Sequence, residues 1–129
     1  MAISQRGTTS SDGAWIATEA AIPDQDDPPS REEITLGPVL AALADPHRRR
    51  VVATLVLAPD GTEIGCSSFG LPVTKATRTY HFRMLREAGL IGMVDYGNCR
   101  KTYLRRADIE AKFPGLLAWL VAEVEAAPS

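Results

Sequence analysis

The chain has 129 residues, of which 45% are apolar and 23% are charged, and its formal net charge is −2. This length allows one domain of ordinary size with a tail, and the composition is that of a soluble globular protein. The longest apolar run, 51–59, is far too short to span a bilayer, and the polar first 13 residues lack the apolar core of a signal peptide. We therefore expect the protein to remain in the cytoplasm.

Charge is unevenly distributed along the chain. Residues 1–33 carry two basic and seven acidic side chains, residues 34–106 carry eleven basic and five acidic ones, and residues 107–129 carry one basic and four acidic ones. The middle of the chain is therefore basic and both ends are acidic. Such a division allows a local positive field over one surface, which is what attraction of nucleic-acid phosphates requires.

We expect an acidic tail at 1–32 and a folded domain at 33–129. The tail is rich in Ser, Thr, Gly, Asp and Pro, and its run IPDQDDPPS cannot hold a regular helix or a central strand, so we expect it to be flexible. Order should begin near Ser30, where Ser30-Arg31-Glu32-Glu33 has the pattern of a capping box. A first helix with apolar residues at helical spacing follows. Asp45-Pro46 then predicts the N-cap and first position of a second helix.

The middle of the chain contains the pattern of a helix-turn-helix motif. Glu63–Phe69 predicts a short helix, a turn follows at 70–73, and the stretch 74–88 has apolar residues at helical spacing. Gly89 stands where a C-terminal glycine usually ends a helix. A short helix, a turn and a longer helix in this order are typical of proteins that present the second helix to the DNA major groove.

The longer helix has two distinct faces. Phe82 and Leu85 fall on one face, which we expect to pack against the domain. Thr77, Tyr80 and Arg83 fall on the opposite face, where a hydroxyl, a phenol and a guanidinium can donate to base edges and phosphate oxygens. This face has the composition of a recognition helix.

A β-hairpin is predicted directly after this helix. Two extended runs, Ile91–Tyr96 and Lys101–Arg105, flank the tight reversal Gly97-Asn98-Cys99-Arg100. Arg100 and Lys101 lie near its tip, where positive charge can touch a sugar-phosphate backbone. A hairpin beside a helix-turn-helix motif is a wing, and we place the wing contacts at 97–101.

The last segment carries a complete apolar stripe. From Phe113 to Val124, apolar residues recur at i, i+3, i+4, i+7, i+8 and i+11, which is one face of a helix. A small domain has little core left to cover such a stripe, so we expect this helix and the first one to form a dimer interface; packing within the chain is the alternative. The expected interface residues are Leu36, Val39, Leu40, Leu43, Leu116, Leu117, Leu120, Val121 and Val124.

Three stretches together resemble the ArsR-type (ArsR/SmtB-like) winged helix-turn-helix transcriptional regulators. They are LADPHRRR at 43–50, TYHFRMLREAGLI at 79–91 and the hairpin at 97–106, and the resemblance covers roughly residues 34–125. The first two motifs in this order and spacing are specific, whereas either alone is weak. The resemblance implies a mainly α fold with a small β-hairpin, in which four helices precede two strands and a fifth helix. It further implies a homodimeric repressor that binds a palindromic operator and leaves it when an inducer binds or reacts.

The sequence departs from this family at the metal sites and at one helix position. Cys66 stands alone where the family's thiolate motif needs a close pair, and no His follows His81 to serve a site on the last helix. We therefore predict no metal and no cofactor. Cys66 and Cys99 are expected to be free thiols, with a thiol sensor as the alternative. Arg78 replaces an apolar residue of the family and is expected to snorkel toward phosphate.

Our leading hypothesis is a dimeric DNA-binding repressor whose partners are double-stranded DNA, a second copy of the chain and an unknown small-molecule or redox inducer. The alternative is a winged-helix protein-interaction module with weak, non-specific DNA affinity. An enzyme is not expected, because the sequence has neither a phosphate-cradling Gly-rich loop nor a nucleophile motif. For His81, which matches a family residue near the DNA backbone, a bridging role inside the domain stays open. The candidate DNA-binding residues are Thr74, Lys75, Thr77, Arg78, Tyr80, His81, Arg83, Asn98, Arg100 and Lys101.

Overall fold

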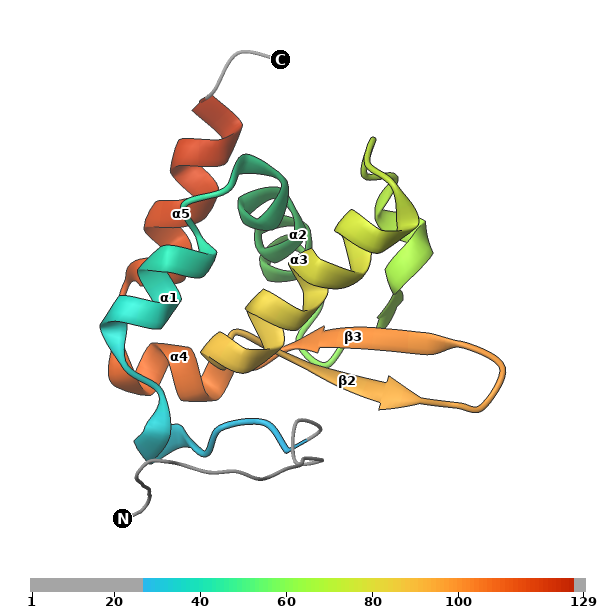
Figure 1. Ribbon diagram of the computed structural model, residues 1–129. Helices are drawn as coiled ribbons and strands as arrows, with labels where there is room; N and C mark the ends of the chain where they lie inside the picture. The colour runs from blue at the N-terminus through green and yellow to red at the C-terminus, as the bar shows by residue number, and fades with distance from the viewer. Residues whose placement is uncertain (1–26, 127–129) are drawn as a thin grey trace, which may run out of the picture.

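The computed structural model describes residues 27–126, so most of the predicted flexible tail at 1–32 lies outside the described residues, as do 127–129. The described part of the chain contains five α-helices, two short 3-10 helices and a three-stranded antiparallel sheet (Figure 1). The predicted fold class, a mainly helical winged helix-turn-helix with a small hairpin, is confirmed. No helix within residues 27–126 has both the length and the apolar character needed to cross a membrane.

The first two helices begin where local capping signals place them. After the 3-10 helix η4 (Arg31–Glu33), α1 (Leu36–Ala42) accommodates Pro38 in its first turn, where a missing N–H has no helical partner to lose. The helix α2 (Pro46–Leu57) begins after the N-cap residue Asp45. Its Oδ1 accepts hydrogen bonds from the backbone N–H groups of His47 at 2.8 Å and Arg48 at 3.2 Å. The predicted Asp45-Pro46 start is confirmed.

The long helix α3 (Lys75–Ala88) also agrees with its predicted limits. Thr74 Oγ1 accepts a hydrogen bond from Thr77 N at 3.1 Å, which satisfies a free donor of the first turn. Gly89 ends the helix with φ +91°, a conformation that favours glycine. Phe82 and Leu85 are buried, as the helical pattern predicts.

The hairpin is present and a third strand joins it. β2 (Ile91–Asp95) and β3 (Arg100–Leu104) pair antiparallel, with Met93 opposite Thr102. The strand β1 (Ile64–Gly65) pairs with the other edge of β3, which gives the order β1-β3-β2.

The prediction of a helix at Glu63–Phe69 is therefore wrong. This stretch forms β1 followed by the 3-10 helix η5 (Cys66–Phe69), which ends at Gly70 in the left-handed region. A seven-residue stretch with an internal glycine gains little as an isolated helix. Pairing of Ile64 with Thr102 satisfies its backbone groups instead.

The predicted C-terminal helix begins later than expected, because α5 (Leu116–Ala126) carries its apolar stripe only from Leu116 onward. A separate helix that was not predicted, α4 (Arg106–Lys112), precedes it, and Phe113 lies in the break between the two. Pro114 disfavours the helical conformation at the preceding residue, and Phe113 has φ −136° and ψ 72°. Gly115, with φ +87°, completes the reversal.

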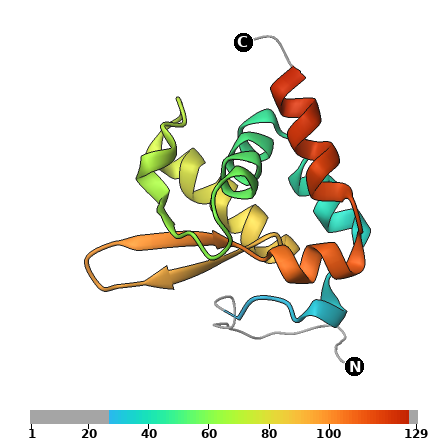
Figure 2. The ribbon, with the colours of Figure 1, turned by 180° about the vertical axis from the view of Figure 1, so that it is seen from behind.

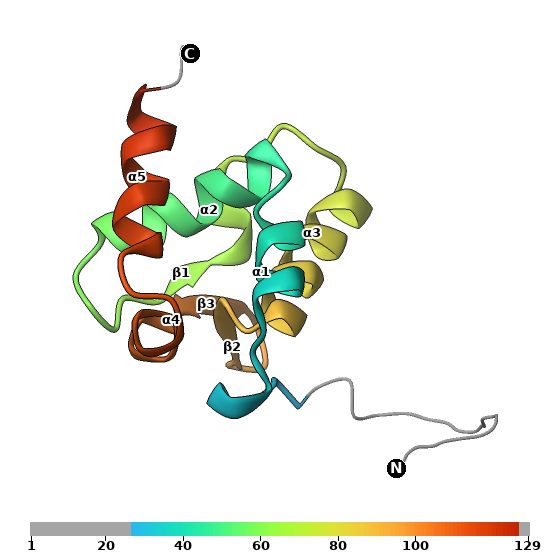
Figure 3. The same cartoon turned by 90° about the vertical axis from the view of Figure 1, so that its left-hand side faces the viewer.

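The core lies between the helices and the root of the sheet. Figure 3 shows α3 and α5 on opposite sides of the bundle, with α1 and α2 between them, and Figure 2 shows the molecule from behind the view of Figure 1. The helix α3 and the wing therefore lie on one outer side of the domain, and α1 and α5 lie on another. The largest fully buried apolar side chains are Ile34, Val39, Val51, Val52, Leu85, Leu90, Ile91, Ile109 and Leu117.

Candidate nucleic-acid interface

The outer face of α3 is polar and open to solvent. Thr77 and Arg83 are exposed, and Tyr80 keeps 45% of its surface accessible. The Arg83 guanidinium carbon lies 5.7 Å from the centre of the Tyr80 ring, and that of Arg48 lies 5.9 Å from it. These cation–π contacts restrict the orientation of the phenol. The three predicted base-reading residues are thus brought together on one accessible face.

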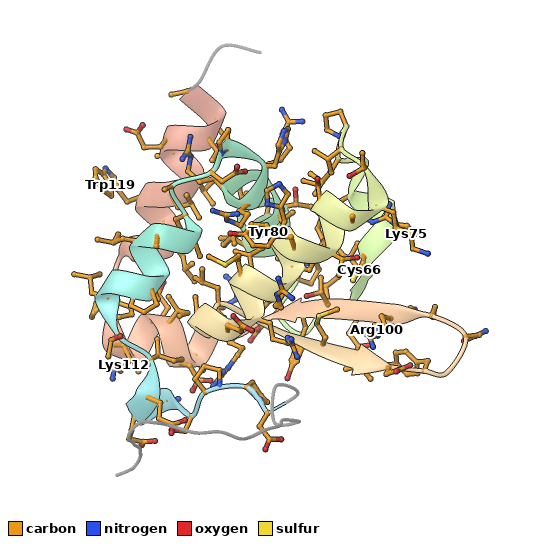
Figure 4. The ribbon with its side chains drawn as sticks, viewed as in Figure 1. Cys66, Lys75, Tyr80, Arg100, Lys112 and Trp119 are labelled. Atoms are coloured by element: carbon orange, nitrogen blue, oxygen red, sulfur yellow. The ribbon has the colours of Figure 1, made fainter. Side chains whose placement is uncertain are left out.

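A groove of about 780 Å³ lies between α3, η5 and the wing. We call it the basic groove, because its lining includes six cationic side chains and no acidic one. Figure 4 shows Lys75 and Arg100 on this side of the molecule, on α3 and on the wing respectively. A concentration of positive charge between a recognition helix and a wing fits a phosphate backbone. The six cations are Lys75, Arg78, Arg83, Arg86, Arg100 and Lys101.

The wing tip carries exposed polar groups. Asn98 and Arg100 are exposed, and Arg100 Nε lies 3.8 Å from Asp95 Oδ2 in a solvated ion pair. The Tyr96 hydroxyl donates a hydrogen bond to the Glu63 carboxylate, which raises the pKa of Tyr96. The ammonium of Lys101 lies 5.7 Å from the centre of the Tyr96 ring. The wing is thereby attached to the segment that precedes η5.

His81, in contrast, lies inside the domain. Its side chain is buried, and Nδ1 lies 3.0 Å from Nη1 of Arg48. Burial lowers the pKa of His81, and the nearby Asp45 carboxylate only partly offsets this effect. Arg48 also donates from Nε to the carbonyl of Ala42 at 2.7 Å. The structure therefore gives His81 the bridging position, between α3 and the start of α2, rather than an accessible place beside DNA.

The remaining predicted site residues of α3 and η5 line the basic groove. Arg78 is half-buried there, beside Cys66. Burial raises the pKa of the Cys66 thiol, and the positive charges of Arg100 and Arg78 partly offset this. Cys66 and Cys99 are both free thiols that border the groove. Among residues 27–126, no group of three or more His, Cys, Asp or Glu side chains is placed to hold a metal ion.

Sequence reasoning missed Arg86 as a member of the groove. The signal was present, because Lys75, Arg78, Phe82 and Arg86 follow one another at three- and four-residue steps. Such steps keep residues on one stripe of a helix. This stripe faces the wing, and it is distinct from the outward face that carries Thr77.

A second surface, the α1–α5 groove, has a volume of about 720 Å³. Leu40 and Trp119 border it and are 50% and 68% exposed, and Leu36 is exposed nearby on α1. Trp119 lies on the outer side of α5, far from Lys75 and Arg100 (Figure 4). The predicted interface residues Leu116 and Val124 also line this groove.

Four of the nine predicted interface residues are buried within their own chain. Val39, Leu43, Leu117 and Leu120 are each at most 7% exposed. The α5 stripe is wide enough for part of it to pack on α2 while the rest remains at the surface. Leu43 and Leu120 also line the α1–α5 groove, and the dimer interface itself stays a prediction.

Comparisons with known proteins found similar transcriptional regulators. No model of a known protein family matches the chain. The chain is 32% identical over 84 residues to the uncharacterised HTH-type transcriptional regulator YceK of Bacillus subtilis (strain 168), and this match covers 64% of the chain and 82% of that protein. A crystal structure of an ArsR family transcriptional regulator is similar over 83% of this chain and 94% of its own, with a TM-score of 0.52 and 23% identity. An ArsR-like transcriptional regulator from Rhodococcus sp. RHA1 is 26% identical, over 68% and 80% of the two chains, with a TM-score of 0.46.

Proposed function

This chain belongs to the HTH-type transcriptional regulators and has the winged helix-turn-helix fold of the ArsR family, and we propose that it is a dimeric repressor that binds a specific palindromic operator. The observation that supports this most directly is the basic groove, which lies beside the exposed face of α3. In this proposal residues 33–129 form the DNA-binding and dimerisation domain. It acts in the cytoplasm and releases the operator in response to an inducer.

The recognition helix enters the major groove through its outer face. Thr77, Tyr80 and Arg83 contact base edges there, because they are accessible polar side chains that share the outer face of α3. One phosphate backbone of the operator passes through the basic groove. The residues that hold phosphate or sugar are Thr74, Lys75, Arg78, Asn98, Arg100 and Lys101.

Two copies associate through the α1–α5 groove. Two of its apolar side chains, Leu40 and Trp119, are exposed in the single chain, and an isologous contact between two such faces removes them from water. Two-fold symmetry then presents two α3 helices to half-sites about 34–36 Å apart, which requires a palindromic operator. The interface residues in this proposal are Leu36, Leu40, Leu116, Trp119, Val121 and Val124.

The basic groove also gives an inducer a route to the DNA contacts. Cys66 and Cys99 both border it, so an oxidant or electrophile that modifies either thiol changes the surface that faces phosphate. N-ethylmaleimide alkylates both thiols. If the affinity for the operator remained unchanged after this treatment, a role of the thiols in sensing the inducer would be excluded.

The test is selection of bound fragments from the source genome with purified protein, followed by titration of the recovered sequence by fluorescence anisotropy. We expect an inverted repeat, and a steep fall of log affinity with log salt concentration. A protein that stays oligomeric but binds all sequences equally weakly would instead be the protein-interaction module. That outcome would overturn the repressor proposal.

A further inference from the structure

The described chain begins beside the basic groove. Pro28 lines a cavity of about 290 Å³, whose other walls include two cations, Arg86 and Arg100, and one carboxylate, Asp95. Arg86 and Arg100 also line the basic groove, so the two cavities share these walls. Figures 1 and 2 show residues 27–30 running alongside β2.

Several contacts fix the point at which the N-terminal segment arrives. The carbonyl oxygen of Pro29 accepts a hydrogen bond from Arg105 Nη1 at 2.6 Å. Arg31 Nε forms an ion pair with Asp108 Oδ1 at 2.8 Å, and the Ser30 N–H donates to the Glu33 carboxylate at 2.9 Å. The described chain is therefore anchored next to the groove at its N-terminal end.

The sequence just before this point is strongly acidic. Glu19, Asp24, Asp26 and Asp27 lie within nine residues, and the stretch 7–30 contains no Lys or Arg. The basic groove has the opposite character, since its lining is cationic and includes no acidic side chain. Asp24 is four residues from Pro28, which corresponds to a reach of about 13 Å for an extended chain. The acidic residues can thus reach the shared cations without any change in the domain.

We propose that the acidic stretch 19–27 occupies the basic groove of its own chain in the absence of DNA and competes with phosphates for it. This inference rests on the proposed DNA-binding function. Tethering gives the stretch a local concentration on the order of millimolar, and its contacts are purely electrostatic. It therefore weakens DNA binding. Displacing the stretch costs the same free energy in specific and non-specific complexes, so it lowers both affinities by the same factor.

A zero-length carbodiimide reagent, which couples carboxylates to lysine amines in contact, tests the occupancy directly. The chain has three lysines: Lys75 and Lys101 line the groove, whereas Lys112 lies elsewhere, with Nζ 3.4 Å from the carbonyl of Glu32 (Figure 4). In the full chain at low salt, we expect peptide mapping to find links from 19–27 to Lys75 or Lys101. Links to Lys112 alone, or none, would overturn the proposal. A mixture of ¹⁵N-labelled and unlabelled protein identifies links between copies, which would overturn it as well.

The effect on DNA is measured with Asp24→Asn/Asp26→Asn/Asp27→Asn. We expect this variant to bind a random-sequence duplex about fivefold more tightly than the unaltered protein at about 50 mM salt, with the difference vanishing at high salt as the charges are screened. A matched control removes three charges elsewhere: Glu32→Gln, Asp60→Asn and Glu110→Gln.

Equal gains in affinity from the variant and its control would show a general charge effect and overturn the competition. If neither the protein nor the variants bind DNA, the proposed function fails, but the crosslinks still decide whether the acidic stretch occupies the groove. The two proposals can therefore fail independently.

Discussion

Nη1 of Arg48 lies 3.0 Å from Nδ1 of His81, and so connects the start of α2 to the middle of α3. A guanidinium can only donate, so Nδ1 must be the unprotonated nitrogen and the histidine is neutral. The same guanidinium donates to the carbonyl of Ala42 at 2.7 Å and to that of Ala41 at 3.4 Å, which also holds the end of α1. One buried side chain thus fixes three helices relative to one another.

Replacing this side chain should destabilise the domain. Arg48→Ala leaves buried acceptors on Ala42 and His81 without a donor, and we expect the free energy of unfolding to fall by about 2–4 kcal/mol. Arg83→Ala is the matched control, because Arg83 is exposed on α3 and its loss should change stability by less than about 0.5 kcal/mol. Urea denaturation followed by circular dichroism gives both values. Similar losses in the two variants would show that the Arg48 bridge has no special role.

Stability should depend on pH through His81. Its pKa is lowered in the folded protein by burial, whereas the unfolded chain takes up the proton near the ordinary value of 6.5. Unfolding therefore binds a proton as the pH falls below 6.5, and the free energy of unfolding should decrease until the pH reaches the folded-state pKa. Denaturation between pH 5 and 8 measures this slope. We expect His81→Gln to flatten it and His47→Gln to retain it; a slope that survives in the first variant would assign it to another group.

Two variants should distinguish base contacts from phosphate contacts by their different effects on DNA affinity. Arg83→Ala should cost about 1–3 kcal/mol on the operator and relax specificity at one position. Lys101→Ala should weaken binding to all sequences alike and reduce the slope of log affinity against log salt by about one. Anisotropy titrations with the operator and its single-base variants distinguish them. Uniform weakening by Arg83→Ala would identify Arg83 as a phosphate contact instead.

The α1–α5 groove should control association of two copies. Trp119→Ser removes a large apolar side chain that is 68% exposed in the single chain, and burial of such a side chain contributes about 1.5–3 kcal/mol. The dimer dissociation constant should therefore rise at least about tenfold, as measured by sedimentation velocity. Leu57→Ser is the control, because Leu57 is 62% exposed but does not line the groove. If both variants associate like the unaltered protein, the interface lies elsewhere.

Gly89 should tolerate substitution less well than Gly97, which has nearly the same backbone conformation. A Cβ at Gly89, with φ +91°, would meet Cγ1 of Ile34 at 2.5 Å, whereas a Cβ at Gly97, with φ +90°, would meet nothing within 4 Å. Both alanine variants incur about 1–2 kcal/mol for the left-handed conformation. The clash should cost Gly89→Ala about 1–3 kcal/mol more in urea denaturation. Equal losses would show that the segment at Ile34 moves aside freely.

Elements fixed by neighbouring residues were predictable from the sequence. The Asp45 cap of α2 and the end of α3 at Gly89 each depend on contacts within a few residues, so their residue types are sufficient signals. The wing was similarly predictable from the glycine and asparagine at its reversal. The resemblance to a known family then related these local elements to one fold.

Features that depend on distant partners were not predictable. Ile64 becomes a strand because Thr102 pairs with it, and nothing near Ile64 in the sequence indicates that partner. The stripe on α5 did not reveal which of its residues pack on α2: Leu117 is buried there, whereas Leu116 borders the outer groove. His81 has helical spacing compatible with either side of α3. The bridge from Arg48 decides its position.

The central position of β3 in the sheet has a further consequence. Since β1 holds one edge of β3 and β2 holds the other, the wing cannot swing independently of the segment that leads into α3. The two elements are therefore held at one relative position, and in the proposed complex the protein fixes the spacing between the bases contacted by α3 and the phosphates contacted by the wing. Operators of this regulator should accordingly differ in base identity within each half-site, but not in half-site length.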